Sequence, residues 1–463
     1  MGHVATDLAA VSHPGRAPAA GYVPDRGGTE TAITGATGFL GTRVARELLD
    51  RGQRLVLLAH AGSGDALTRL ERYLTVTGAP PSMVSGLRER ARAVEVDIGE
   101  PLLGLTPDAF HALAGALRTV WHCAADTTLS GAAEQVRRVN VEGTRHVLDL
   151  AAAAPGRVAV FHVSTAFVAG SRHDEVAYED DLDGSQGFEN PYERSKFDSE
   201  VLVRQWSART GRPVVVFRPS LLLTDLPSHP DLPPHTLDAV ARAVLTIASM
   251  AARLDLDDGG NTRSGGTVRS GGTGGTAEAS RPTVRVVADP RARLNVMAVE
   301  DAAQDMVRIA DRAPSDGVTT YHVVGESDLT LSQVLAFLEE FFPARFSAVP
   351  HPPADQTELE RLTGQLPGFA SYLLHRRAFD DTRARTVLGE RPPRRPIDRD
   401  YLLSALGIGE LIDRTDLDET PAALAAGGRE TLDRALTARE RRHDQQHRSR
   451  ARPTARPHAM GVS

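Results

Sequence analysis

The chain has 463 residues, which is longer than one hydrophobic core usually serves, so a main domain with a second lobe is expected. Its net charge of -7 gives no general attraction to nucleic acid, and its content of 41% hydrophobic and 24% charged residues is ordinary for a globular protein. Cys123 is the only cysteine, which excludes an intrachain disulfide and a cysteine-based zinc site and fits a reducing cytoplasm.

The chain begins with a segment that we expect to be disordered. Residues 1–28 are rich in Ala, Gly and Pro, have no sustained periodicity and lack the apolar centre of a signal peptide. No apolar run in the chain approaches the roughly 18 to 20 residues that a membrane helix needs. We therefore expect a cytoplasmic protein with no membrane span, no nucleic-acid partner and no metal site.

Short apolar runs then alternate with helical patterns. Each run is mostly apolar, as is typical of strands buried on both faces of a parallel sheet. Together, the alternating segments predict an α/β fold with a doubly wound parallel (Rossmann) sheet. The predicted strands are residues 31–35, 54–59, 92–97, 118–124, 157–164 and 213–220, and the helical patterns include residues 39–52, 134–154 and 191–211.

The C-terminal half has a different organisation. Residues 255–281 are low-complexity Gly, Ser and Thr, which predicts a disordered insertion. A strand, a loop and a helix return at residues 283–305, and we assign this segment to the same Rossmann domain as residues 29–225. The remaining ranges are a smaller, mostly helical substrate lobe at 226–254 and 306–436 and a disordered basic tail at 437–463.

The first predicted strand leads into a glycine-rich turn, "TGATGFLG". A tight glycine turn lets backbone N–H groups approach a pyrophosphate, and the start of the following helix supplies partial positive charge. Because this turn follows the first strand and opens the first helix, it predicts a dinucleotide-binding site. The candidate binding residues are Gly35, Thr37, Gly38, Phe39, Leu40 and Gly41.

The end of the second predicted strand bears on which dinucleotide binds. An acidic residue there would bind the ribose 2′-hydroxyl of NAD and repel the 2′-phosphate of NADP. The first acid after this strand is Asp65, whereas His60 and Arg69 are close by, so the sequence favours NADPH. Asp97, which ends the third predicted strand, is a candidate acceptor for the adenine amino group.

Lys196 is the only lysine among 53 basic residues, which indicates a position where a guanidinium cannot replace an ammonium. Tyr192 precedes it by four residues, so both side chains lie on one face of a predicted helix. The fifth predicted strand ends in "VSTAFVAG", where Ser164 or Thr165 can face the ligand crevice. These groups suit carbonyl reduction, with Tyr192 as the acid and Lys196 lowering its pKa.

Together these motifs resemble the extended form of the short-chain dehydrogenase/reductase superfamily, and within it the thioester reductase and fatty acyl reductase branch. By position, the resemblance implies Thr165 as the hydroxyl that binds the substrate oxygen, Tyr192 as the acid and Lys196 as its partner, with Ser164 beside them. It also implies cofactor contacts at Ile98, Ala124, Ala125, Asn140, Lys196 and Pro219. The motifs are "TGATGFLG", "VDIGEPLLGLT", "VWHCAAD", "NVEGTRHVLDLA", "HVSTAFVAG", "NPYERSKFDSE" and "FRPS", in that order.

The sequence departs from the branch in two places. The branch usually has an arginine where this chain has His60, and the segment after the sixth predicted strand, "LLLTDLPSHPDLPPHTLD", differs from the common pattern. The resemblance therefore does not extend to the identity of the acyl substrate.

The resemblance implies an NADPH-dependent reductase of an acyl thioester, bound to coenzyme A or an acyl carrier protein, that yields an aldehyde, with further reduction to an alcohol left open. A ketone or hydroxyl oxidoreductase or a sugar-nucleotide epimerase is the first alternative, because such enzymes use the same three side chains. The second alternative is a non-catalytic dinucleotide-sensing protein; the presence of both Tyr192 and Lys196 argues against it.

Overall fold

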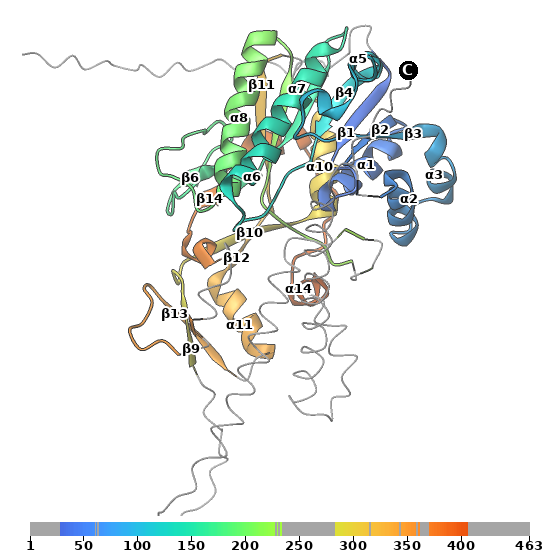
Figure 1. The fold of residues 1–463 in the computed structure, drawn as a ribbon. Coiled ribbons are helices and arrows are strands. Elements are labelled where there is room, and N and C mark those ends of the chain that lie inside the picture. Colours follow the sequence, from blue (N-terminus) through green and yellow to red (C-terminus); the bar gives the residue numbers. More distant parts are fainter. Residues whose placement is uncertain are drawn as a thin grey trace, which may run out of the picture.

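A computed structural model describes residues 28–60, 64–226, 283–313, 316–341, 344–357, 360–361 and 370–405, together with a few single residues between these ranges. The expected leader, insertion and tail lie outside the described residues, apart from Gly28. At the centre is a seven-stranded sheet in the order β11-β7-β5-β4-β1-β2-β3, with every neighbouring pair parallel (Figure 1). The strands are β1 (Glu30–Thr34), β2 (Arg54–Ala59), β3 (Ala91–Glu95), β4 (Leu117–His122), β5 (Ala159–Val163), β7 (Val214–Pro219) and β11 (Val318–Val323).

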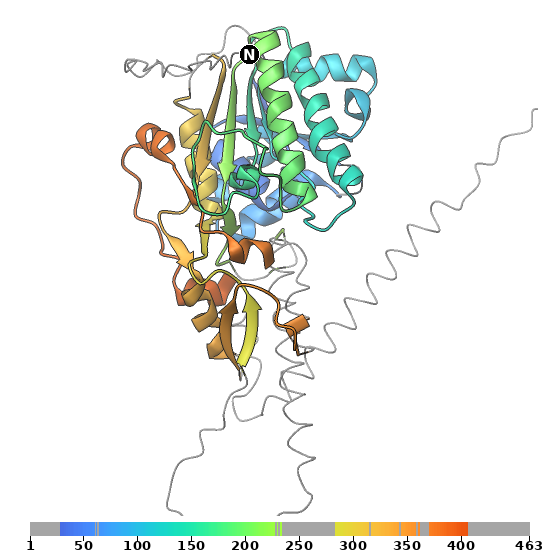
Figure 2. The ribbon, with the colours of Figure 1, turned by 90° about the vertical axis from the view of Figure 1, so that its left-hand side faces the viewer.

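Helices cover both faces of this sheet, as the predicted fold requires (Figure 2). Successive strand side chains point to opposite faces, so Ile33 packs in one buried cluster and Ala32 in the other. The cluster with Ile33 includes α1 (Phe39–Asp50), α2 (Ala66–Val76) and α10 (Val299–Ala310). The cluster with Ala32 includes α5 (Pro107–Ala116), α7 (Gly143–Ala153) and α8 (Pro191–Thr210). The prediction of a doubly wound sheet is therefore confirmed.

The predicted elements agree with the structure to within a few residues, with one correction. The helical pattern at residues 134–154 is not one α-helix: α6 (Ala133–Arg137) and α7 are joined by a π-helical turn, η2 (Arg138–Glu142). The shorter elements on this side of the chain are α3 (Pro81–Ser85), α4 (Leu87–Arg90), η1 (Pro101–Gly104), η3 (Ala166–Ala169) and β6 (Val176–Ala177).

The smaller lobe contains short strands as well as helices. Strand β10 (Arg293–Ala298) lies between β8 (Leu221–Leu223) and β12 (Asp328–Thr330), and β9 (Thr283–Val287) pairs with β13 (Arg345–Val349) (Figure 1). The other elements of this part are α11 (Leu331–Phe341), η4 (Ala370–Leu374), β14 (Ala378–Phe379), α13 (Thr382–Leu388) and α14 (Arg399–Ala405).

Two of the expected boundaries need correction. Residues 318–323 were assigned to the lobe, but they form β11, an edge strand of the central sheet that runs parallel to β7. Residues 283–287 were assigned to the Rossmann domain, but among the residues that the structure describes β9 pairs only with β13, outside the central sheet. Both errors have the same cause, because the pairing partner of a strand lies far away in the sequence.

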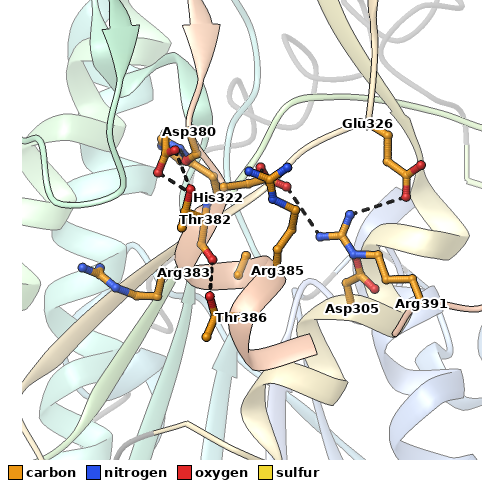
Figure 3. Close-up of polar contacts among 12 residues, drawn as sticks. Asp305, His322, Glu326, Asp380, Thr382, Arg383, Arg385, Thr386 and Arg391 are labelled. Carbon is orange, nitrogen blue, oxygen red and sulfur yellow. Dashed lines mark hydrogen bonds and ion pairs between the residues drawn. The ribbon is translucent and has the colours of Figure 1, made fainter. Parts of the chain in front are cut away.

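A polar network attaches α13 to the edge of the central sheet (Figure 3). The Nδ1 of His322, on β11, lies 2.6 Å from the carbonyl oxygen of Asp380, and the Asp380 carboxylate accepts a hydrogen bond from the Thr382 hydroxyl at 2.7 Å. Beyond α13, Arg391 pairs with Glu326 at 3.7 Å and with Asp305 of α10 at 3.9 Å. The network therefore connects the C-terminal elements of the lobe back to the Rossmann core.

No helix among the residues described here has the length and apolar character needed to cross a membrane.

The turn between β1 and α1 brings two backbone segments very close together. Gly35 has a φ of +67°, a region that glycine adopts most readily. A Cβ atom on Gly41 would lie 2.0 Å from the carbonyl oxygen of Gly35, which is far shorter than any real contact. Glycine at this position is therefore what lets α1 pack against the end of β1.

We predict that Gly41→Ala lowers the free energy of unfolding by about 1–3 kcal/mol, because the added methyl group must push backbone atoms apart. Gly115→Ala is the matched control, since a Cβ atom there meets nothing within 4 Å and Ala favours a helix over Gly. Thermal melts of both variants test this, and equal melting temperatures for Gly41→Ala and the wild type would contradict it.

Candidate active site

The candidate residues gather at the carboxyl ends of the parallel strands, where ligands bind in sheets of this kind. The glycine turn follows β1, Ala124 follows β4, and Thr165 follows β5. Helix α8 begins at Pro191 and carries Tyr192 and Lys196 past the same edge (Figure 1).

The glycine turn forms a cradle of backbone groups. The N–H of Gly38 donates to the carbonyl oxygen of Gly35 at 2.9 Å, and α1 begins directly after Gly38 with no side-chain cap. A Cβ atom on Gly35 would lie 2.8 Å from the backbone nitrogen of Ala124, so side chains are excluded from the floor of the turn. Phe39 and Leu40 lie in the first turn of α1, and backbone N–H groups at the start of a helix suit a pyrophosphate group. The residues present therefore fit a dinucleotide.

The residues expected around the adenosine lie together at the ends of β2 and β3. The imidazole Nε2 of His60 is 4.0 Å from the Asp97 carboxylate, and both side chains are largely exposed. Arg69 of α2 donates to the carbonyl oxygen of Thr37, in the glycine turn, at 3.2 Å. Asp65 is engaged elsewhere, because its carboxylate caps α2 by accepting from the N–H of Leu67 at 3.1 Å. The chain after β2 therefore offers the cofactor a cationic side chain, Arg69, and a histidine, His60. Its first carboxylate, Asp65, is used to cap α2.

Ile98 follows Asp97 and packs against the start of α7. A Cβ atom on Gly143 would lie 3.0 Å from the Ile98 side chain, and the Nδ1 of His146 lies 2.8 Å from the Ile98 carbonyl oxygen. Residue Ile98 is therefore attached to α7, and Asp97 lies just after the carboxyl end of β3.

Ala124 and Ala125 form the loop after β4, and a chain of hydrogen bonds holds this loop. The N–H of Ala124 donates to the Thr34 hydroxyl at 3.1 Å, and that hydroxyl lies 2.8 Å from Nδ1 of His122. The other ring nitrogen of His122 is 3.0 Å from the hydroxyl of Thr144, on α7. Burial lowers the pKa of His122 to about 3, so this ring is neutral. The first and fourth strands are thereby fixed to each other beside the glycine turn.

Asn140 lies in the π-helical turn, and its side chain positions the loop after β4 and the start of α8. Its amide group accepts from the N–H of Asp126 at 2.7 Å and donates to Asp126 O at 2.9 Å and to the Ser195 hydroxyl at 2.8 Å. Its carbonyl oxygen accepts from Thr144 and Ser199. The extra residue of a π-turn frequently occurs at functional sites, and here it aims Asn140 at α8.

Thr165, Tyr192 and Lys196 converge at the end of β5. The ammonium of Lys196, only 2% exposed, donates to the Val163 carbonyl oxygen at 2.7 Å. Tyr192 is one helical turn earlier and hydrogen-bonds through its side chain with that of Thr165. The structure therefore brings together the three residues that the sequence singled out as a hydroxyl, a phenol and an ammonium.

One electrostatic expectation is wrong in this structure. Burial raises the pKa of Tyr192 to about 12, and only the hydrogen bond to Thr165 opposes it, whereas the expectation was a pKa lowered by Lys196. Burial also lowers the pKa of Lys196 to about 8, and the carboxylate of Glu200 partly counteracts this. The reason is that the ammonium points at the Val163 carbonyl rather than at the phenol.

Ser164 has different surroundings from its neighbour Thr165. Its buried hydroxyl makes no hydrogen bond of normal geometry, but it lies near Glu200, on α8, and contributes to lowering the pKa of that carboxyl. The larger contribution comes from Arg218 of β7, which opposes the effect of burial and contacts Glu200 through Nε at 2.9 Å and through a terminal nitrogen at 2.8 Å. Adjacent residues at a strand end point in opposite directions, so Thr165 faces Tyr192 while Ser164 faces the ion pair. Pro219 follows Arg218 and ends β7 at the same edge.

Sequence reasoning missed a second set of residues around the start of α8. The Tyr372 hydroxyl, from the lobe, donates to the Glu193 carboxylate at 2.7 Å and accepts from the Asn190 side chain at 3.0 Å. Burial raises the pKa of Glu193 to about 7, with the Tyr372 hydrogen bond opposing it. A carboxylate beside Tyr192 was visible in the sequence, but its partner is 179 residues away.

Comparison with known proteins shows what the chain is similar to in sequence. Residues 33–257 match the family model described as Male sterility protein. Nonribosomal peptide synthetase asaC of Aspergillus flavus is 32% identical over 202 residues, which are 42% of this chain and 20% of that protein. Carboxylic acid reductase of Mycobacterium tuberculosis is 26% identical over 318 residues, which are 64% of this chain and 24% of that protein. The chain thus spans about a fifth to a quarter of the length of these two relatives.

The fold is also found in solved structures. The terminal R domain from the myxalamid PKS-NRPS biosynthetic pathway superposes with a TM-score of 0.62 at 23% identity, covering 85% of this chain and 93% of that one. The fold, the glycine cradle and the sequence matches agree, and they support an NAD(P)-dependent oxidoreductase on the extended short-chain dehydrogenase/reductase fold, with a segment similar to the Male sterility protein family.

Proposed function

We propose that this protein is an NADPH-dependent reductase of acyl thioesters that releases an aldehyde. The observation that carries the proposal is the convergence of Thr165, Tyr192 and Lys196 at the strand edge beside the glycine cradle. An acyl thioester is favoured over other carbonyl compounds because the similar proteins include a carboxylic acid reductase and a nonribosomal peptide synthetase. The acyl group would be presented as a thioester of an acyl carrier protein or of coenzyme A.

The chain's own residues have distinct roles in this reaction. When bound, a reduced nicotinamide supplies a hydride to the thioester carbonyl carbon. Tyr192, which its raised pKa keeps protonated at neutral pH, donates its proton to the carbonyl oxygen as negative charge develops there. Thr165 donates a hydrogen bond to the same oxygen. The resulting hemithioacetal then breaks its C–S bond, which releases the thiol and leaves the aldehyde.

The cofactor would be held along the edge already described. The turn from Gly35 to Gly41 would hold the pyrophosphate, and Asp97 and Ile98 would face the adenine. Lys196 would hydrogen-bond the nicotinamide ribose, because its ammonium lies at the end of β5 and no other lysine is present in the chain. The loops at Ala124, Ala125 and Pro219 would line the rest of the cofactor site, with Asn140 keeping the first of these loops in place.

We predict that purified protein with NADPH and a panel of acyl-coenzyme A thioesters releases one thiol for each aldehyde formed. NADPH oxidation and free thiol are measured in the same reaction, with Tyr192→Phe expected to be slower by about 10²- to 10⁴-fold because it lacks the acidic proton. A panel of ketones and nucleotide sugars is run in parallel. Turnover of those compounds, without thiol release from any thioester, would support an oxidoreductase or epimerase of another kind instead.

We predict that Lys196→Met lowers turnover by about 10²- to 10⁴-fold, because the ammonium that positions the ribose and the end of β5 is lost. Lys196→Arg should lose a similar factor, and its larger head group should also cost about 1–3 kcal/mol of stability in this buried site. Arg194→Met, at an exposed cation of the same helix, is the matched control. Retention of more than about a third of wild-type turnover in both Lys196 variants would contradict the assignment.

The pH profile provides a second readout for Lys196. Its ammonium form is the major one only below its pKa of about 8, so wild-type turnover should fall as the pH rises through that value. The Lys196→Met variant has no group to titrate, and its residual turnover should lack this decline.

We predict that the enzyme prefers NADPH over NADH, measured as the ratio of kcat/KM for the two cofactors. The cause is the cationic group that follows β2, together with the engagement of Asp65 in capping α2 rather than in binding a ribose 2′-hydroxyl. Arg69→Gln should reduce the preference on the order of 10- to 100-fold, the equivalent of a lost charge-assisted hydrogen bond. Arg72→Gln, on the exposed face of α2, is the control. Equal or better turnover with NADH in the wild type would refute the proposed cofactor.

A further inference from the structure

Three side chains outside the candidate active site meet at one point. His173 follows η3, Glu189 precedes α8, and His375 follows η4, so the three come from separate segments of the chain. Each offers one ligand atom, and these atoms all lie within 4.8 Å of one another. No metal site is expected from the sequence, in which His375 lies far from His173 and Glu189.

Backbone hydrogen bonds hold the three segments in place. The N–H of Arg376 donates to the carbonyl oxygen of His173 at 2.7 Å, and the N–H of Glu189 donates to the Glu193 carboxylate at 3.0 Å. The carbonyl oxygen of His375 accepts from the N–H of Arg293 at 2.9 Å. The three side chains therefore start from fixed positions, which reduces the entropy lost when a ligand binds.

His375 is buried without satisfying its ring nitrogens. The residue is 3% exposed, and neither Nδ1 nor Nε2 makes a hydrogen bond of normal geometry. The closest polar group to Nε2 is Oε1 of Glu189, at 3.3 Å. A buried polar atom that lacks a partner costs free energy. A ligand bound by the His375 ring would therefore recover part of that cost.

The other two side chains provide the rest of a coordination shell. The Nε2 of His173 lies 4.0 Å from Oε1 of Glu189, and its ring stacks on that of His375 with centroids 4.5 Å apart. The side chain of His173 is 46% exposed, so this side of the cluster is open to water and leaves room for the ring to move. Neutral imidazole and carboxylate are the forms that bind metal ions.

Nearby arginines are matched by carboxylates. Arg172 pairs with Asp181 at 3.1 Å, and Arg376 pairs with Asp174 at 2.6 Å. Arg377 lies in the field of Glu193, the largest of the charges acting on it, and donates to the Gly170 carbonyl oxygen. These pairings reduce the repulsion that a bound cation would meet.

We propose that His173, Glu189 and His375 bind a zinc ion, with a water molecule as the fourth ligand. Two histidines and one carboxylate are a zinc donor set, and an open fourth position accommodates water. Ligands bound at about 2.0–2.2 Å to a tetrahedral ion lie about 3.4 Å apart, against about 3.0 Å for neighbouring ligands of an octahedral ion. The 3.3 Å between His375 and Glu189 fits the tetrahedral edge, and half-exposed His173 must move about 0.6 Å closer to the Glu189 carboxylate and also adjust its distance from His375.

The bound ion would join three parts of the chain. It would connect the loop after η3 and the residue two positions before α8 to the lobe segment at His375. Because α8 carries Tyr192, the ion would stabilise the contact between the lobe and the start of that helix. This role is structural and does not depend on which substrate the enzyme reduces.

The test is zinc binding by the full-length chain after treatment with a chelator, followed by calorimetry with ZnCl₂ and by thermal melts. The wild type should bind zinc at this site and melt at a higher temperature with zinc than without it. His173→Ala and His375→Gln each remove a direct ligand and should weaken zinc binding by more than about 100-fold. Loss of a residue that only hydrogen-bonds to a ligand typically costs about 10- to 100-fold. Both variants should also lose the zinc-dependent rise in melting temperature.

Two controls separate this site from other histidines. His111→Ala removes an exposed histidine of α5 and should leave zinc binding unchanged. The double change His443→Ala and His447→Ala removes two histidines of the basic tail and should also leave the zinc-dependent melting shift in place. If that double change abolished the shift, or if His173→Ala and His375→Gln both bound zinc as the wild type does, the proposed site would be wrong.

Cobalt distinguishes the geometry. With Co²⁺ in place of zinc, the strong visible absorption of a tetrahedral ion should appear in the wild type and be absent in His173→Ala. The His173 side chain is half-exposed, so its removal should leave the core intact and the variant folded. A weak, octahedral-type spectrum in the wild type would overturn the assignment of a tetrahedral zinc site.

Discussion

The arrangement of the candidate active site depends on one buried hydrogen bond, from the Lys196 ammonium to the carbonyl oxygen of Val163. An ammonium removed from water is costly unless fixed polar groups replace its solvent, and here the end of β5 supplies such a group. The bond attaches α8 to the strand end from which Thr165 emerges. The spacing between Thr165 and Tyr192 is therefore set by the same contact that buries Lys196.

Two further polar connections fix α8 against sliding. Glu200, about one turn beyond Lys196, is paired with Arg218, so the helix is also attached to β7. Asn140 attaches it to the π-helical turn through Ser195 and Ser199. Hydrogen bonds are directional, whereas apolar contacts tolerate small shifts when side chains repack. A helix whose task is to present a phenol and an ammonium at a strand edge therefore benefits from a polar rather than a wholly apolar attachment.

The smaller lobe meets the same helix at its other side. Tyr372 bonds to Glu193 and Asn190 at the first turn of α8, and His375 lies against Glu189. The cofactor-side contacts and the lobe-side contacts thus act on adjacent residues, with Tyr192 between them. If the lobe binds the substrate of the proposed reaction, this geometry lets it place a carbonyl group beside the phenol.

The sequence by itself determined the local elements of the fold and the pairing of Tyr192 with Lys196 on one helix face. β2 was predicted with its observed bounds, the glycine turn was found at the start of α1, and the lone lysine pointed to the helix that carries Tyr192, because periodicity, glycine spacing and residue choice are local properties. Only the tertiary structure placed β11 in the central sheet and turned Thr165 rather than Ser164 toward Tyr192. Only it, too, raised the pKa of Tyr192 and gathered His173, Glu189 and His375. Strand pairing, burial and the partners of a polar group arise from contacts between segments that are far apart in the chain, and no local pattern records them.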